Sequence, residues 1–184
     1  MGKPLKIGIS GKSGCGNTTV SRLVAERLGI KMINYTFKQI AVERSMDFME
    51  LCRLAQTDSS WDLYLDRRQI EMANEVDECV LGSRLAVWLL ENADLKVYLT
   101  APIEVRAARI QQRDNGLVES VLQETLARDR SDHERYLKLY GLDNNKYEFV
   151  DLIVNTEHLE PQEVAQIIIR AAEQLRAHET GQPG

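Results

Sequence analysis

Cysteine is scarce in this chain, and its spacing excludes the structures that cysteines usually build. The chain has three cysteines, far apart in the sequence and without a C-x-x-C pair (Cys15, Cys52 and Cys79). An odd number of isolated cysteines is typical of free thiols in a reducing compartment, not of a disulfide framework or a zinc site. The three histidines also share no ligand spacing, so we predict no metal centre built from His or Cys.

The chain also lacks the features of exported, membrane-spanning and nucleic-acid-binding proteins. Residues 1–6 contain no apolar segment typical of a secretion signal. The hydrophobic and charged fractions, 43% and 28%, are ordinary for a globular chain, and the formal net charge of −5 argues against binding to a nucleic-acid polymer. We therefore expect a cytoplasmic monomer of one domain, with no membrane and no nucleic-acid partner.

Short apolar runs alternate with helical patterns along the chain, as expected of a parallel sheet covered on both faces. The runs are Leu5–Ser10, Lys31–Asn34, Cys79–Leu81, Leu95–Leu99 and Leu152–Val154. The helix after the first run is predicted to end at Gly29, and the last helix is predicted to begin at Pro161. The sequence thus predicts an α/β fold with a five-stranded parallel sheet flanked by helices.

Two connections between predicted strands are too long for simple crossovers. Both are largely helical, and they run from Phe37 to Glu75 and from Ile103 to Tyr140. We expect each to form a small cap over the sheet. The predicted parts are a core of residues 1–35, 78–105 and 141–184, a first insertion of residues 36–77, and a lid region of residues 106–140.

A glycine-rich segment lies between the first predicted strand and the first predicted helix, the context of a phosphate-binding loop. It follows the motif G-x-x-x-x-G-K-[ST], except that Asn17 stands where the motif has Lys; Thr18 holds the position whose hydroxyl contacts Mg²⁺. Such a loop directs backbone N–H groups and a helix dipole at an anion. The residues predicted to bind nucleotide phosphates are Gly11, Lys12, Ser13, Gly14, Cys15, Gly16, Asn17, Thr18 and Thr19.

Arginines are concentrated in the second cap. Arg106, Arg109 and Arg113 recur at i, i+3 and i+7, which places them on one helical face. Guanidinium groups bind phosphate oxygens bidentately, so a lid of arginines can stabilise a transferring phosphoryl group. The alternative is a solvated helix pair joined by Arg–Asp and Arg–Glu pairs; we favour the lid. The predicted catalytic residues are Lys12, Arg109, Arg113, Arg128, Arg130 and Arg135.

The first cap and the edge of the third predicted strand contain candidates for binding an acceptor. Asp62, Asp66 and Gln69 share one helical face and can read the edge of a base. A charged surface is equally compatible with this pattern. An arginine at the carboxyl end of a strand is well placed for a substrate phosphate. The predicted substrate-binding residues are Lys38, Asp62, Asp66, Arg67, Arg68, Gln69 and Arg84.

With these motifs in this order, the chain resembles the nucleoside monophosphate kinases, most closely the short cytidylate kinases of the archaeal type. The segments that carry the resemblance are the phosphate loop, Leu65–Gln69, Ser83–Ala86, Ala93–Val97, Arg106–Arg113, Arg128–Tyr136 and Asp151–Thr156. The resemblance implies a P-loop NTPase fold with helical NMP-binding and lid insertions. It also implies Mg²⁺-dependent transfer of the ATP γ-phosphoryl group to CMP or dCMP, with Lys38 and Arg84 holding the acceptor phosphate.

The chain departs from this family at three positions. Asn17 replaces the loop lysine, Gly82 replaces an acid, and Lys38 replaces an arginine. One hypothesis is that Lys12 supplies the missing charge; the alternative is that Lys12 faces solvent. Two other functions remain open: a P-loop kinase for another acceptor such as AMP or UMP, and a nucleotide-binding protein with weak or no kinase activity.

Overall fold

The sheet is fully parallel, and its first strand lies at the centre. The computed structural model describes residues 4–114 and 118–180, and its strands pair in the order β2-β3-β1-β4-β5. The strands are β1 (Lys6–Gly11), β2 (Lys31–Ile33), β3 (Cys79–Gly82), β4 (Leu95–Thr100) and β5 (Leu152–Asn155). Each observed end lies within one residue of the predicted end, so the prediction of a five-stranded parallel sheet is confirmed.

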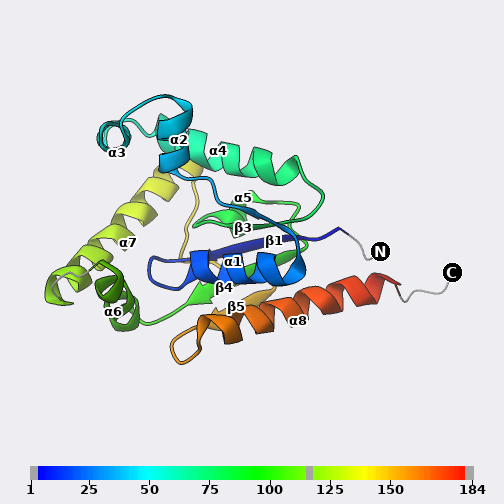
Figure 1. Ribbon diagram of the computed structural model, residues 1–184. Coiled ribbons are helices and arrows are strands. Elements are labelled where there is room, and N and C mark those ends of the chain that lie inside the picture. The colour runs from blue at the N-terminus through cyan, green and yellow to red at the C-terminus, as the bar shows by residue number, and fades with distance from the viewer. Residues whose placement is uncertain (1–3, 115–117, 181–184) are drawn as a thin grey trace.

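Helices cover both faces of this sheet (Figure 1). The helices are α1 (Asn17–Leu28), α2 (Phe37–Glu43), α3 (Phe48–Ala55), α4 (Ser60–Asn74), α5 (Ala86–Leu89), α6 (Ile103–Asp114), α7 (Val118–Tyr140) and α8 (Pro161–Thr180). On one face, Val24 of α1 and Ile168 of α8 join Ile7 and Val97 of the strands in the main core. On the other face, Ala73 of α4 and the segment of α5 pack against β2 and β3.

Local sequence signals fix several helix ends. α1 ends at Gly29, whose φ of 65° lies in the left-handed region that glycine adopts at low cost. The side chain of Asp47 accepts hydrogen bonds from the backbone N–H groups of Met49 and Glu50 and thereby caps α3. Pro161 is the first residue of α8, where its missing N–H is not needed. The predicted limits at Gly29 and Pro161 are confirmed.

The two helical insertions lie at the same end of the sheet, beyond the carboxyl ends of the strands (Figure 1). α2, α3 and α4 share a small core around Ile40 and Leu51. α6 and α7 share another around Ala107 and Val121. The functional site is therefore expected between these segments. In the described part of the chain, no helix is long and apolar enough to span a bilayer.

We expect Ile168→Ala to destabilise the protein by about 2–5 kcal/mol, because it leaves a cavity in the main core. Ile168 is fully buried, whereas its neighbour Ile167 on the same helix is 38% exposed. Ile167→Ala is the matched control, with the same change in helix propensity and little loss of burial. Urea denaturation of both variants measures the difference, and equal destabilisation would contradict the assigned helix face.

Candidate active site

The glycine-rich loop forms one wall of a cavity at the carboxyl edge of the sheet. Gly14 and Gly16 have φ values of 85° and 89°, and these left-handed conformations curl the loop toward the start of α1. Gly16 precedes α1 and has no side chain to cap it, so the N–H groups of the first turn are available to an anion. The cavity has a volume of about 640 Å³ and is lined by residues 11–19. The predicted phosphate-binding residues thus lie together.

Two arginines of α6 form hydrogen bonds that connect this helix to the loop and to the segment after β5. Arg106 is 5% exposed, and its guanidinium donates to the carbonyl of Ser13 (3.1 Å) and to both carboxylate oxygens of Asp129 in α7 (3.2 and 2.7 Å). Arg109 donates to the hydroxyl (2.9 Å) and the carbonyl (2.5 Å) of Thr156, which follows β5. The predicted arginine face therefore points at the loop, but these two side chains also hold it in place.

The cations that line the cavity come from several elements. They are Lys12, Arg84, Arg109, Arg113 and Arg128. Most have protein partners: Arg84 contacts Ser13 and Asp132, and the ammonium of Lys12 donates to the side-chain oxygen of Asn145 (2.8 Å). Arg128 is exposed, and within the described residues no hydrogen bond or ion pair holds its guanidinium.

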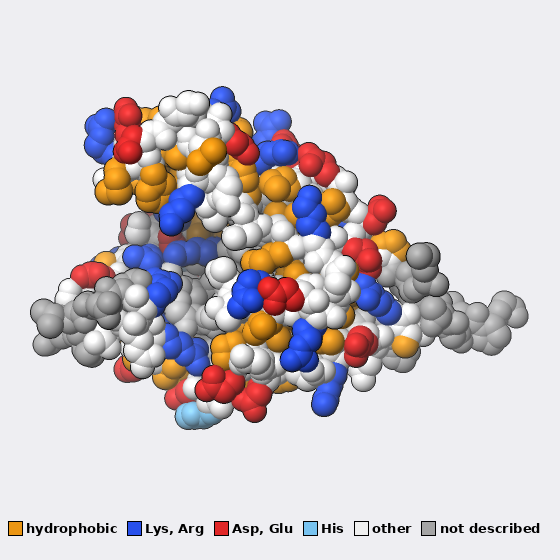
Figure 2. Space-filling view, viewed as in Figure 1, with side chains coloured by type: hydrophobic (Ala, Val, Ile, Leu, Met, Phe, Trp, Pro, Cys, Tyr) orange, Lys and Arg blue, Asp and Glu red, His pale blue; other side chains and the backbone are white. Residues whose placement is uncertain are grey.

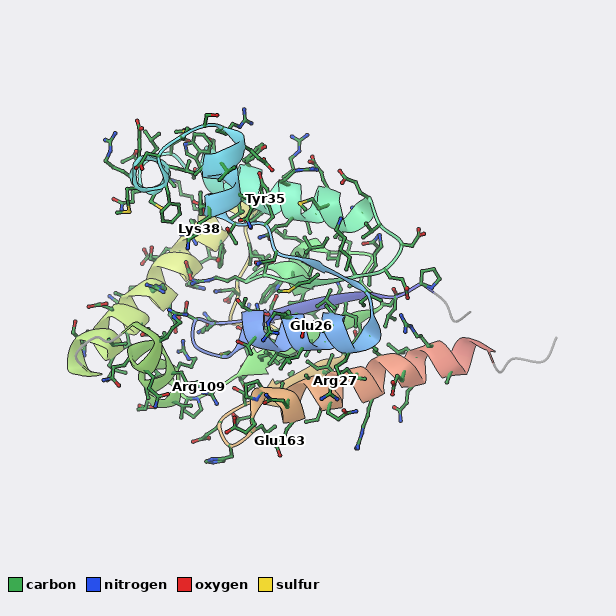
Figure 3. The ribbon with its side chains drawn as sticks, viewed as in Figure 1. Glu26, Arg27, Tyr35, Lys38, Arg109 and Glu163 are labelled. Atoms are coloured by element: carbon green, nitrogen blue, oxygen red, sulfur yellow. The ribbon has the colours of Figure 1, made fainter. Side chains whose placement is uncertain are left out.

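In the space-filling view, the molecule is hollowed between the α2–α4 segment and the start of α1, and Lys and Arg side chains gather there (Figure 2). Figure 3 labels Lys38 on α2 and Arg109 on α6, on opposite sides of this hollow. Lys38 is exposed, with its ammonium 5.9 Å from the centre of the Phe48 ring. Bound phosphate groups would thus meet positive charge from both insertions and from the core.

Asn17 lies in the cavity wall, where the motif has lysine. Its amide nitrogen donates to the carbonyl of Ser83 (3.2 Å), and its amide oxygen accepts from the hydroxyl of Ser21 (3.1 Å). Gly82, at the end of β3, also lines the cavity. This corner of the site is therefore neutral.

The residues fit a Mg²⁺ ion that arrives with a nucleotide. Thr18 is exposed on the first turn of α1 and lines the cavity. Mg²⁺ keeps several waters and takes most other ligands from nucleotide phosphates, so few protein ligands are required. Glu160 is the one carboxylate among the described lining residues. Thr18 would hold such an ion, which would neutralise charge on the phosphates.

A second polar cluster joins α4 to α7. The Tyr140 hydroxyl donates to Asp66 (2.7 Å), and the Arg135 guanidinium lies 3.7 Å from Asp62 and 2.7 Å from Asp132. Burial raises the pKa of Asp66 to about 6, and it also raises the pKa of Asp62, against the opposing effect of Arg135. Asp62 and Asp66 of the predicted aspartate face thus meet the opposite cap, where their partners are Arg135 and Tyr140.

Other predicted residues lie apart from these clusters or have structural partners. Gln69 is buried and donates to the carbonyl of Tyr35 (2.7 Å). Arg67 and Arg68 form ion pairs with Glu71 and Glu75 along α4, as in the charged-surface interpretation. Arg130 is exposed and is not among the described residues that line the cavity.

Several residues that organise the site were not predicted from the sequence. Thr156 is 2% exposed and its hydroxyl donates to the carbonyl of Cys15 (3.3 Å). Its position after a predicted strand, at the same sheet edge as the loop, was a usable signal. Asp129 and Tyr140 give no comparable signal, because their partners are distant in sequence. The contact of Asp132 with Arg84 is equally remote, although Asp132 also pairs with the nearby Arg135. Burial raises the pKa of the Cys15 thiol, so this cysteine is not an activated nucleophile.

The parallel sheet, the glycine loop at the start of α1 and the arginines facing it define a P-loop nucleotide-binding protein. Residues 6–158 match the cytidylate kinase-like family, and the chain belongs to that family. A solved shikimate kinase from Bacteroides thetaiotaomicron has a similar fold, with a TM-score of 0.62, 13% identity and coverage of 93% of this chain and 97% of that one.

Curated relatives match most of the chain. "Cytidylate kinase 2" of Borrelia garinii subsp. bavariensis is 44% identical over 168 residues, which cover 89% of this chain and 94% of that protein. A cytidylate kinase of Pyrococcus horikoshii is 40% identical over 173 residues, covering 93% and 90%. The predicted P-loop fold and the family resemblance are therefore confirmed.

We expect the stability of the wild type to fall relative to that of Asp66→Asn as the pH rises from about 4 to about 7. The pKa of Asp66 is raised from 3.8 to about 6 in the folded protein. The folded state therefore holds this proton more tightly than the unfolded state, and ionisation destabilises it by up to about 3 kcal/mol. Asparagine keeps an acceptor oxygen for Tyr140 and removes the titration.

Urea denaturation at several pH values measures this difference. Asp58→Asn is the control, because Asp58 is exposed and its pKa is lowered by hydrogen bonds from Ser60. The contribution of Asp58 to the free energy of unfolding is lost only as the pH falls toward and below its ordinary pKa of 3.8, and it is nearly constant from about pH 5 to pH 7. A stability difference between wild type and Asp66→Asn that does not change with pH would contradict the burial of this carboxylate.

Proposed function

We propose that the protein transfers the γ-phosphoryl group of ATP, bound with Mg²⁺, to CMP or dCMP. The observation that carries this proposal is one cavity lined by the phosphate loop and by arginines of the turn after β3, of α6 and of α7, in a chain of the cytidylate kinase-like family. A protein that only binds a nucleotide does not need several cations around a phosphoryl group that is being transferred. The names of the curated relatives support the same activity.

The donor phosphates would lie on the loop and the first turn of α1. In phosphoryl transfer, negative charge spreads over the equatorial oxygens of the moving group, and catalysis consists mainly of positioning and charge stabilisation. We assign this stabilisation first to Arg128, whose guanidinium can meet the phosphoryl group without first breaking an ion pair in the described structure. Lys12 would first have to leave Asn145. Arg109 and Arg113 complete the cationic wall.

The acceptor would lie between α4 and α7. With a pKa of about 6, Asp66 is ionised at neutral pH, so it and Asp62 offer acceptors for the exocyclic amine of cytosine. Uracil lacks this amine and presents a carbonyl instead. Arg84 and Lys38 are the cations we assign to the acceptor phosphate.

A second candidate function is nucleotide binding with weak or no transfer. The neutral corner formed by Asn17 and Gly82 favours it, because a P-loop kinase usually has a lysine there. The acceptor assay below separates the two functions.

We expect CMP and dCMP to be the best acceptors in a coupled assay of ADP release with ATP and Mg²⁺. The panel contains CMP, dCMP, UMP, AMP and shikimate. An aspartate pair that accepts from the cytosine amine should favour CMP over UMP by about ten- to a hundredfold in kcat/KM. A kcat/KM for AMP that is tenfold higher than that for CMP would contradict the assigned acceptor. The absence of transfer to any acceptor would favour the binding function.

We expect Arg128→Ala to lower kcat by about 100- to 1000-fold, because it removes a charged donor from the transferring group. Arg130→Ala is the matched control on the same helix: it removes the same charge two residues away, where the side chain does not line the cavity within the described residues. Steady-state kinetics of both variants with CMP measures the effect. Equal losses in the two variants would point to a general electrostatic effect of α7.

A further inference from the structure

Asn17 belongs to the phosphate loop in sequence, but its side chain is hydrogen-bonded to the turn after β3 and to the buried side of α1. Its amide nitrogen donates to the carbonyl of Ser83, and its amide oxygen accepts from Ser21. Ser21 is fully buried. Both functional groups of this side chain thus already have protein partners.

Gly82 completes this arrangement by leaving room for it. A Cβ atom at Gly82 would lie 2.4 Å from the hydroxyl oxygen of Ser21 and 2.7 Å from its Cβ. No real side chain tolerates such distances, so a side chain at position 82 and the buried serine exclude one another. The residues at positions 17, 21 and 82 therefore form one neutral unit.

The Ser83 carbonyl connects this unit to the acceptor side of the site. It accepts a second hydrogen bond from the buried hydroxyl of Ser10 (2.9 Å), which itself accepts from the N–H of Val87 (3.1 Å). The turn that follows β3 is thereby held from both sides. Arg84 is the next residue, and its guanidinium reaches Ser13 and Asp132.

We propose that Asn17 is a positioning residue for the acceptor: it fixes the turn after β3, and with it Arg84, instead of binding the donor phosphates. This inference rests on the proposed function. It also implies that Asn17→Lys alone does not recreate the usual lysine of the motif. This substitution removes the hydrogen bond to the carbonyl of Ser83 and leaves the hydroxyl of Ser21 in place.

The test compares the apparent affinities for the two substrates in Asn17→Ala. Loss of the hydrogen bond to a turn that carries a substrate ligand should raise KM for CMP by about tenfold or more. KM for ATP should change by less than about threefold, because the backbone N–H groups of the loop remain. A purely structural role would not separate the two constants. A rise in KM for ATP with KM for CMP unchanged would overturn the proposal.

Ser21→Ala provides an independent check, since it removes the bond that orients the amide of Asn17 but leaves the donor to Ser83. We expect a smaller rise in KM for CMP, about two- to fivefold. The double variant Asn17→Ala/Ser21→Ala should be no worse than Asn17→Ala, because Ser21 acts through Asn17. Additive effects on KM for CMP would overturn the proposed unit. Ser21→Ala also carries the test if Asn17→Ala does not fold.

Asn17→Lys separates the remaining possibilities. We expect Asn17→Lys to raise KM for CMP as Asn17→Ala does and to leave kcat no higher than in the wild type. A sharp increase in kcat would show a loop that merely lacks its lysine and would overturn the proposal. Calorimetric titration with CMP and with ATP gives the same comparison without turnover. If the wild type binds CMP without phosphorylating it, the proposed function is contradicted. The binding data for the Asn17 variants still test the role of Asn17.

Discussion

The buried guanidinium of Arg106 is the interaction on which the geometry of the site depends. It donates to the carbonyl of Ser13 in the loop, to the carboxylate of Asp129 in α7 and to the carbonyl of Ala101, just before α6. A buried charge is tolerated only when it is paired and hydrogen-bonded. Helix α6 lies so close to the loop that a Cβ atom at Gly14 would be 2.7 Å from the carbonyl oxygen of Arg106. Loop, α6 and α7 are thus fixed relative to one another.

The fold could be predicted from the sequence because its signals are local. Strands buried on both faces appear as short apolar runs, and the ends of α1 and α8 are marked by Gly29 and Pro161. The loop was predictable for the same reason, since one segment contains its glycines, its hydroxyls and the start of its helix. The cation at the end of β3 followed from a rule about strand ends.

The partners of individual side chains could not be predicted, because packing between distant segments decides them. The shared face of Asp62, Asp66 and Gln69 was visible in the sequence. Gln69, however, donates to the carbonyl of Tyr35 just before the first insertion, and Asp66 accepts from a tyrosine 74 residues away. Arginine spacing likewise does not show which guanidinium groups hold the loop and which face the cavity. Arg106 and Arg109 donate to the loop carbonyls of Ser13 and Gly14, whereas Arg128 makes no such bond within the described residues and lines the cavity.

Asp132 shows how the two sides of the site are coupled in the proposed reaction. Its carboxylate contacts both Arg84, from the core, and Arg135, from the same helix. A phosphate that binds Arg84 brings more negative charge than this carboxylate and competes with it for the same donors. In the proposed reaction, displacement of Asp132 from Arg84 would leave more of its charge to Arg135, which also pairs with Asp62 on α4. Binding of the acceptor phosphate would then depend on how α7 lies against α4.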